Sequence, residues 1–406
     1  MLAYSVECGS GPWEMILKSR EGLRDTSLFI VAAFIFVTIY VAIRLIYRLY
    51  ISPLSKFPGP RLAAATLWYE FYYDAVLKGR YTFKIKELHK KYGPIIRISP
   101  YELHIDDPEY YHVLYSYSPA RDKYYYYLKP FDFPLSAFGT ESHRAHRFRR
   151  RALNPFFFRQ RVAQHERLVQ TLVQKFCKRI DEFDAAGKIV PISLGYVCLI
   201  TDLITSYVLD TNYQYLDTPD WFPHWRRALG SASEMVMISR QVTWVLSLLK
   251  CVPQSWTAGL DPGLALFFRL AGQFHQKVNE IWSERNLPRR GGNMKPSRGY
   301  TLVDQVMDSI LAPGEKTPDR LIAEIRSTIS AGIETTSNAL TVTTYHMLEN
   351  PTRLQRCREE LLALEPDPRV EFKACDLEKL PYLTSVVLEG LRYYRQSSCA
   401  SSIYLS

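Results

Sequence analysis

The chain has 406 residues, of which 47% are hydrophobic and 14% are aromatic, so it is able to bury a large core and is not a disordered segment. The net charge of +10 comes from basic residues that are interleaved with acidic ones, and no nucleic-acid-binding module accompanies it, which excludes a nucleic-acid partner. The seven cysteines are odd in number and form no C-x-x-C pair, which favours reduced thiols facing the cytosol.

The first feature along the chain is an uncharged, almost wholly apolar stretch from Thr26 to Ile43. Its large apolar residues sum to about −5 kcal/mol on the membrane-insertion scale, which favours insertion. We predict a short luminal tail over residues 1–25 and a transmembrane anchor over residues 26–51. A cleaved signal peptide and a buried core helix are the alternatives, but the stretch runs into Arg44 rather than into small residues. The basic residues after the anchor favour a cytosolic position for the rest of the chain.

A proline-rich segment comes next, over residues 52–60, and includes Pro53 and Phe57-Pro-Gly-Pro60. Because proline fixes φ and removes an N–H donor, neither a helix nor a strand is expected to continue through it. The segment is therefore predicted to be a stiff linker that spaces the rest of the chain from the membrane. A plain turn is the alternative.

Beyond the linker, the hydrophobic pattern predicts a mainly helical chain with one small sheet. An amphipathic helix over Tyr81–Tyr92 precedes two short strands, Ile95–Ser99 and Glu102–Ile105. Apolar residues at helical spacing predict a helix over Arg159–Phe183. The glycines, prolines and basic residues of Pro288–Tyr300 predict a surface loop.

A long helix is predicted to begin at Thr317-Pro318-Asp319 and to run to Glu349, just before Asn350-Pro351. Its middle, from Ala331 to Thr336, has the sequence A-G-I-E-T-T in an otherwise apolar stretch. Glycine costs about 1 kcal/mol against alanine in a helix, and such a loss of local propensity is typical of functional sites. The alternative is a packing glycine beside a solvated carboxylate.

Four motifs of the chain resemble those of the cytochrome P-450 family. The stretch from Ala331 to Thr336 is similar to A-G-x-[DE]-T-T in the long central helix, and Glu389-Gly390-Leu391-Arg392 is similar to E-x-x-R. Upstream, the basic run that begins at His146 is similar to the helix that supplies an arginine to a haem propionate. Phe57-Pro-Gly-Pro60 after a single anchor matches the microsomal layout. The resemblance covers nearly the whole chain.

The resemblance implies the cytochrome P-450 fold and a monooxygenase that inserts one atom of dioxygen into a hydrophobic substrate. It further implies haem as the cofactor, electrons from NADPH through a reductase, and a place in the endoplasmic reticulum membrane. The basic run suits docking of an acidic reductase. The tyrosine-rich stretch Tyr115–Phe138 falls where the substrate-contacting loop of the family lies, and the overall likeness to oxygenases of the trichodiene type implies a terpenoid substrate. Aromatic packing against the membrane is the alternative for this stretch.

The family motifs also assign roles to single residues. The central-helix acid and threonine of the family have an acid–base role, which falls here on Glu334 and Thr335. Ala331 and Gly332 match the residues that lie close to the haem face, since glycine permits a close approach.

Two further pairs are implied by the same resemblance. His146 and Arg150 match the residues that contact the haem propionates, because a guanidinium suits a carboxylate; a basic helix face is the alternative. Glu389 and Arg392 match the structural ion pair, which is buried in the family and completed by a second arginine. No match for that second arginine occurs after Arg395.

The likeness to the family ends after Arg392. The iron ligand of the family is a cysteine thiolate in F-x-x-G-x-R-x-C-x-G, well beyond E-x-x-R. Only residues 393–406 remain here, and their one cysteine, Cys399, has none of those neighbours. We therefore expect no metal ligand, a partial and inactive cytochrome P-450 domain over residues 61–406, and a fold that is incomplete at its C-terminus. The alternatives are a non-catalytic single-span membrane protein and a binding protein.

Overall fold

The computed structural model describes residues 12–116, 120–221, 224–251, 262–286, 298–365 and 371–397, together with Trp256 and Gly259. The chain divides into two compact units. Unit 1 comprises Met1–Tyr72 and Phe83–Tyr110, and unit 2 comprises Tyr73–Thr82 and Tyr111–Ser406. Cys399 and most of the predicted loop Pro288–Tyr300 lie outside the described residues.

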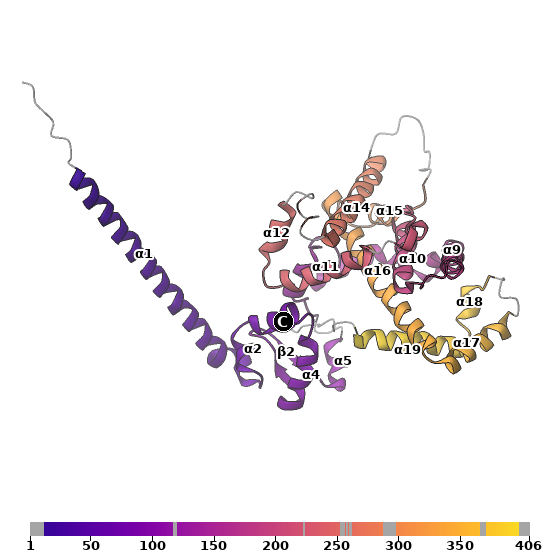
Figure 1. The fold of residues 1–406 in the computed structure, drawn as a ribbon, viewed down its shortest axis with the longest axis horizontal. Coiled ribbons are helices and arrows are strands. Elements are labelled where there is room, and N and C mark those ends of the chain that lie inside the picture. Colours follow the sequence, from indigo (N-terminus) through magenta and orange to yellow (C-terminus); the bar gives the residue numbers. More distant parts are fainter. Residues whose placement is uncertain are drawn as a thin grey trace, which may run out of the picture. The chain divides into compact units, whose positions relative to one another are not determined.

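The predicted mainly helical class with a small sheet is confirmed (Figure 1). The elements up to Tyr110 are α1 (Pro12–Ile46), η1 (Tyr47–Ile51), η2 (Pro53–Lys56), α2 (Arg61–Ala65), α3 (Trp68–Phe71), η3 (Tyr72–Val76), α4 (Tyr81–Tyr92), β1 (Ile95–Arg97), β2 (Leu103–Ile105) and η4 (Pro108–Tyr110).

The described elements of the rest of the chain are almost all helical. They are α5 (Tyr111–Leu114), α6 (Tyr125–Leu128), η5 (Lys129–Phe131), α7 (His143–Leu153), η6 (Asn154–Phe157), α8 (Arg159–Ala163), α9 (Glu166–Ala185), α10 (Ile192–Leu209), η7 (Tyr215–Asp217), η8 (Pro219–Trp221), α11 (His224–Ser239), α12 (Trp244–Cys251), α14 (Pro262–Asn286), α15 (Leu302–Asp308), η9 (Pro313–Glu315), α16 (Pro318–Leu348), α17 (Pro351–Leu364), α18 (Ala374–Leu377) and α19 (Pro381–Ser397).

The N-terminal helix fits the predicted anchor. Within α1 and η1, the stretch Leu28–Ile51 is long and apolar enough to cross a membrane, and none of it is buried against the rest of the protein. Helix α10 also meets the length and composition test, but more than half of it is buried. Its residues belong to the hydrophobic core of unit 2, so α10 is a core helix.

The proline-rich segment lies against the sheet of unit 1. It contains one short 3₁₀ turn, η2, where we predicted no helix. The backbone N–H of Arg97 in β1 donates to the carbonyl of Pro58 at 2.7 Å. A Cβ added at Gly59 would lie 2.3 Å from the carbonyl oxygen of Arg97, so only glycine permits this approach. The segment is thus held to β1 at Pro58 and Gly59.

The two strands pair antiparallel, with Ile96 opposite His104, but both are shorter than predicted. The guanidinium of Arg97 binds the carbonyls of Ser99 and Pro100 at 3.2 and 2.8 Å. These two carbonyls are therefore turned toward a side chain and do not extend the ladder. This local bond has no signal in the alternation of apolar residues.

The core of unit 2 is built around α16, which packs against α10, α14 and α19 (Figure 1). The predicted helix over Arg159–Phe183 is in fact two helices, α8 and α9, separated at Gln164 and His165. The break places the His165 ring edge-on against Tyr207 of α10, with ring centroids 4.8 Å apart. A contact with another helix has therefore overridden the local helical pattern.

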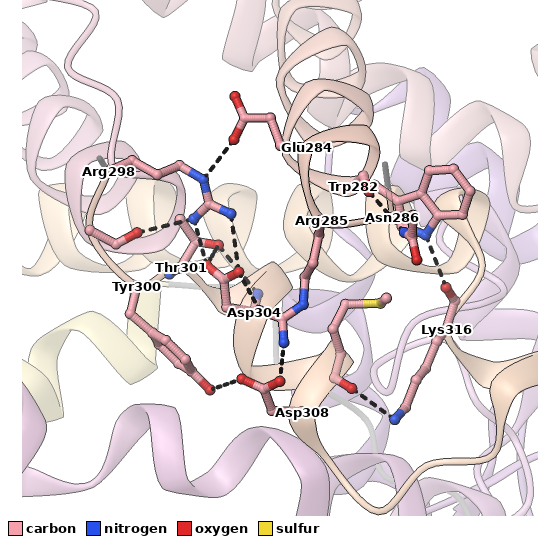
Figure 2. A network of polar contacts seen from close by, with 12 residues as sticks. Trp282, Glu284, Arg285, Asn286, Arg298, Tyr300, Thr301, Asp304, Asp308 and Lys316 are labelled. Atoms are coloured by element: carbon pink, nitrogen blue, oxygen red, sulfur yellow. Dashed lines mark hydrogen bonds and ion pairs between the residues drawn. The ribbon is translucent and has the colours of Figure 1, made fainter. Parts of the chain in front are cut away.

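In unit 2, a network of polar contacts is centred on the carboxylate of Asp304 in α15. Figure 2 shows Arg298 and Arg285 converging on this carboxylate. Arg298 donates two hydrogen bonds at 2.6 and 3.0 Å, and Arg285 donates one at 2.8 Å. Thr301 donates from its backbone N–H and its hydroxyl, and its hydroxyl accepts from the N–H of Asp304, which completes a capping box.

Burial alone would raise the pKa of Asp304, but the hydrogen bonds from Arg298, Thr301 and Arg285 lower it well below its ordinary value of 3.8. A carboxyl whose pKa is lowered in the folded state contributes stability above its ordinary pKa. That contribution is lost as the pH falls toward the folded pKa.

Asp304→Asn is expected to lower the free energy of unfolding by about 3–5 kcal/mol, because it leaves two guanidinium groups without their shared carboxylate. The measurement is urea denaturation of the full chain in detergent, followed by circular dichroism. The matched control is Asp308→Asn on the same helix, whose side chain is 46% exposed against 3% for Asp304. The control is expected to cost less than about 1 kcal/mol. Equal effects of the two substitutions would contradict the role assigned to Asp304.

Candidate functional site

The A-G-x-E-T-T segment occupies the middle of α16 and presents an exposed face there. Most residues from Arg320 to Ile329 are buried, whereas Ala331, Glu334 and Thr335 are exposed. The hydroxyl of Thr335 donates to the carbonyl of Ala331 at 2.8 Å, which fixes the hydroxyl along the helix. Glu334 is accessible to solvent, yet desolvation by the protein around it raises the pKa of its carboxyl.

Gly332 faces α10. A Cβ added at Gly332 would lie 3.2 Å from Cγ1 and 3.3 Å from Cδ1 of Ile204. These distances are tighter than ordinary van der Waals contact, so the glycine allows α10 and α16 to approach closely. The structure therefore gives Gly332 a packing role between two helices.

A cluster of cationic and histidine side chains surrounds His146 on α7. Burial, followed by the charges of Lys123, Arg150 and His143, lowers the pKa of His146 to about 4, so the imidazole is neutral at pH 7. The guanidinium of Arg150 lies 5.7 Å from the centroid of the Phe157 ring. No carboxylate among the described residues forms an ion pair with Arg150. The cluster is therefore suited to carboxylate groups of a ligand.

The neighbouring Arg149 holds α7 in place through a chain of charged groups. Its guanidinium binds both carboxylate oxygens of Glu315, at 2.8 and 2.9 Å. Glu315 also accepts from Arg320 at 2.9 Å, and Arg320 forms an ion pair with Glu324 at 3.3 Å. Glu324 in turn accepts from the N–H of Ala137 at 2.9 Å. This chain joins α7 to the buried beginning of α16.

Sequence motifs do not single out these positioning residues. The spacing of Arg320 and Glu324, at i and i+4, was a signal for their pairing. The partnership of Arg149 with Glu315 spans 166 residues and has no local signal. Of the predicted residues, Ala331, Glu334 and Thr335 lie together, and His146 and Arg150 lie together. No hydrogen bond or ion pair between described residues joins the two groups.

The E-x-x-R pair forms on α19 as its spacing predicts. Arg392 donates to Glu389 at 2.7 and 2.5 Å, and this hydrogen bonding lowers the pKa of the Glu389 carboxyl. Both side chains are about half exposed, so the pair is not buried. Between them, Gly390 is buried: a Cβ added there would lie 2.0 Å from the hydroxyl oxygen of Thr343 on α16. The glycine thus sets how closely α19 docks on α16.

The tyrosine-rich stretch has partners within unit 2. The rings of Tyr124 and Tyr126 stack at 5.7 Å, and those of Tyr126 and Tyr127 meet edge-on at 5.3 Å. Tyr127 also lies under the guanidinium of Arg240, 4.7 Å from the ring centroid. Arg240 forms an ion pair with Asp74 at 3.2 Å. These contacts give the described tyrosines packing partners within the protein.

The described cysteines lie on helices other than α16. Cys198 donates to the carbonyl of Trp221 in the core, and burial raises the pKa of its thiol to about 12. Burial also raises the pKa of Cys177 on α9 and of Cys357 on α17. Cys251 and Cys375 are exposed on α12 and α18. The described cysteines thus have environments that disfavour the thiolate form or lie on exposed helices, whereas the cluster around His146 suits carboxylates of a ligand.

Comparisons with known proteins converge on one family. The family model described as "Cytochrome P-450" matches residues 58–400. The chain is 43% identical over 363 residues to the cytochrome P-450 monooxygenase MO6277 of Ascocoryne sarcoides, covering 87% of this chain and 70% of that protein. It is 36% identical over 348 residues to the tryptophan 6-hydroxylase fscE of Fusarium equiseti, covering 86% of this chain and 67% of that protein.

A solved structure shows the same fold. The crystal structure of a cytochrome P-450 (CYP102L1) superposes with a TM-score of 0.57 at 16% sequence identity. The match covers 76% of this chain and 64% of that one, so the chain spans about two thirds of the solved protein's length. The predicted family fold is confirmed by this likeness.

Arg149→Met is expected to lower the free energy of unfolding by about 1.5–3 kcal/mol, because it removes a charged, partly buried, two-point contact with Glu315. Arg147→Met is the matched control: Arg147 is exposed on the same helix, and its loss is expected to stay within about 0.5 kcal/mol. The measurement is the urea concentration at the midpoint of unfolding, compared between the two variants in detergent. Similar midpoints for the two variants would contradict the positioning role assigned to Arg149.

His146 is expected to titrate near pH 4 in the folded chain, against an ordinary value of 6.5. Because the folded state then binds fewer protons than the unfolded state, stability is complete above about pH 6.5 and falls as the pH drops toward 4. NMR titration of the imidazole tests this. Lys123→Met is expected to raise the pKa of His146, whereas Lys188→Met, an exposed control, is expected to leave it unchanged. An unperturbed pKa would contradict the cationic cluster.

Proposed function

Because the chain belongs to the cytochrome P-450 family, we propose that it derives from a membrane-bound haem monooxygenase that inserts an oxygen atom from O2 into a hydrophobic secondary metabolite. The observation that carries this proposal is the exposed A-G-x-E-T-T face in the middle of α16, directly after the buried first part of that helix. Glu334 and Thr335 are proposed as its acid–base pair. The raised pKa of Glu334 and the fixed hydroxyl of Thr335 support that role.

The haem and its contacts belong to the same proposal. His146 and Arg150 are proposed to hold the haem propionates, and the cationic cluster around His146 supports this. Ala331 and Gly332 are proposed to lie at the haem face, since Ala331 is exposed and Gly332 sets the depth of α16 against α10. Glu389 and Arg392 are proposed as a structural pair that positions α19.

The proposed setting is the endoplasmic reticulum membrane, with α1 as a single-pass anchor and the rest of the chain in the cytosol. The exposed apolar stretch Leu28–Ile51 supports the anchor. Basic residues after it, including Arg44 and Arg48, support the orientation. Electrons are proposed to come from NADPH through a reductase. The exposed arginines of α7, such as Arg144 and Arg147, support docking of an acidic partner.

Two substrate classes are proposed. A terpenoid is suggested by the likeness to oxygenases of the trichodiene type. An indole compound is the second candidate, because a relative that is 36% identical carries the name tryptophan 6-hydroxylase. Both classes present a hydrophobic body, in keeping with the family.

We further propose that these 406 residues, expressed by themselves, are inactive. They contain no F-x-x-G-x-R-x-C-x-G sequence, and the described cysteines are placed elsewhere. The exposed Glu389–Arg392 pair lies beside Leu388 and Leu391, whose apolar side chains are also exposed. A non-catalytic single-span membrane protein or a binding protein is the competing function, and the same observations favour it for this polypeptide.

Membranes that contain the 406-residue chain are expected to show no thiolate-haem band in the reduced carbon-monoxide difference spectrum, because these residues contain no F-x-x-G-x-R-x-C-x-G sequence to supply the thiolate. Membranes with an intact cytochrome P-450 provide the positive control. Immunoblotting of the same fractions establishes that the chain is present. A thiolate-haem band from the 406-residue chain would overturn the proposed inactivity and would identify the chain itself as the monooxygenase.

A further inference from the structure

The end of the apolar N-terminal helix is fixed to the sheet of unit 1 by one buried arginine. Arg97 in β1 is 2% exposed, and its guanidinium donates three hydrogen bonds to carbonyl oxygens. The shortest of these, at 2.7 Å, reaches the carbonyl of Arg48 in η1. The other two bind the turn after β1, at Ser99 and Pro100. Arg97 thus joins η1 to the sheet turn.

A second set of contacts joins η1 to the same turn and to α2. The guanidinium of Arg48 donates to the Tyr101 hydroxyl at 2.6 Å and to the carbonyl of Ala65, the last residue of α2, at 2.7 Å. It also lies 5.3 Å from the centroid of the Tyr101 ring. Arg44, one turn earlier, reaches the same hydroxyl at 3.4 Å. The helix end is therefore attached at several points, on two sides.

The proline-rich segment that connects η1 to β1 is also held against β1. The backbone N–H of Arg97 binds Pro58, and Gly59 lies against the carbonyl of Arg97. The same residue therefore holds the helix end by its side chain and the proline-rich segment by its backbone. Hydrogen bonds from a charged donor are stronger than those between neutral groups, so this set resists separation of the helix end from the sheet.

This attachment fixes the level of α2 relative to a membrane. Because η1 is the last turn of the apolar stretch Leu28–Ile51, it falls at the membrane–water boundary. Helix α2, which is bound to η1, falls at the same level (Figure 1). Its alanines are buried, but Leu62 is 68% exposed. Trp68, Tyr50 and Ile51 are also largely exposed. Aromatic and aliphatic side chains of this kind favour the interfacial layer of a bilayer.

We propose that Arg97 makes the anchor a rigid lever, which presses the surface formed by Tyr50, Ile51, Leu62 and Trp68 into the interfacial layer of the membrane. Arg61 and Lys56 lie next to this surface in the sequence and suit anionic lipid headgroups. The inference rests on the proposed function only in that α1 must span the membrane. Its occupant is the lipid surface itself.

The test uses the full chain in vesicles of phosphatidylcholine and phosphatidylserine. A photoreactive benzoylphenylalanine is placed at position 62 in one sample and at position 83 in another. Leu62 and Phe83 are equally exposed, at 68%, but Phe83 belongs to α4, which lies farther from α1 than α2 does in Figure 1. The readout is covalent attachment of labelled lipid after illumination. Carbonate extraction of the same vesicles reports whether the chain is membrane-spanning.

Position 62 is expected to attach lipid strongly and position 83 only weakly. In Arg97→Met, the chain is expected to resist carbonate extraction as before, while attachment at position 62 falls to the level of position 83. Tyr101→Phe, which removes only the hydroxyl that accepts from Arg48, is expected to change attachment in the same direction.

The outcomes separate the two proposals. Release of the unmodified chain by carbonate would overturn the anchor. Retention of the chain with equal attachment at positions 62 and 83 would overturn the membrane surface alone. Strong attachment at position 62 that persists in folded Arg97→Met and in Tyr101→Phe would overturn the lever. The comparison of positions 62 and 83 needs no substitution at Arg97, so it remains decisive even where Arg97→Met prevents folding.

Discussion

The close approach of α10 to α16 is the contact on which the arrangement of unit 2 depends. Glycine at position 332 favours it, because a Cβ there would lie 3.2 Å from the Ile204 side chain, tighter than ordinary contact. Gly390 of α19 likewise lets that helix approach Thr343 of α16 closely. The central helix therefore lies between two neighbours whose distances are both set by a missing side chain. The face that carries Glu334 and Thr335 owes its position to these contacts, since protein interiors are close-packed and adjust little.

Charged groups then fix what the apolar packing leaves undetermined. Arg149 and Glu315 bring the basic helix α7 to the beginning of α16, and Asp304 draws two arginines to α15. Each carboxylate has more than one cationic partner, as expected where burial makes an unpaired charge costly. The same principle explains why His146 is neutral: it lies among cations with no carboxylate partner of its own among the described residues. Some arginines of the fold, such as Arg149, are thus paired with carboxylates. The cations around His146 are the candidate contacts for a ligand.

Local patterns were sufficient to predict much of this molecule. The bounds of α4 agree with its amphipathic pattern, and α16 begins and ends within a residue of the expected limits. The Glu389–Arg392 pair is explained by its spacing on one helix. The features that the sequence did not reveal depend on residues far along the chain. The break before α9 serves a contact with Tyr207, and Gly332 serves Ile204 rather than only a cofactor face. No periodicity reports such partners.

The bonds around Asp304 have one more consequence, for the stretch of chain between α14 and α15. Arg285 precedes residues 287–297 and Arg298 comes directly after them, and both bind the same carboxylate. The two ends of that stretch are therefore stapled to a common point, whatever lies between them. Asp304 therefore acts as a non-covalent cross-link between the end of α14 and the segment that precedes α15, and this cross-link holds α15 against α14 by side chains.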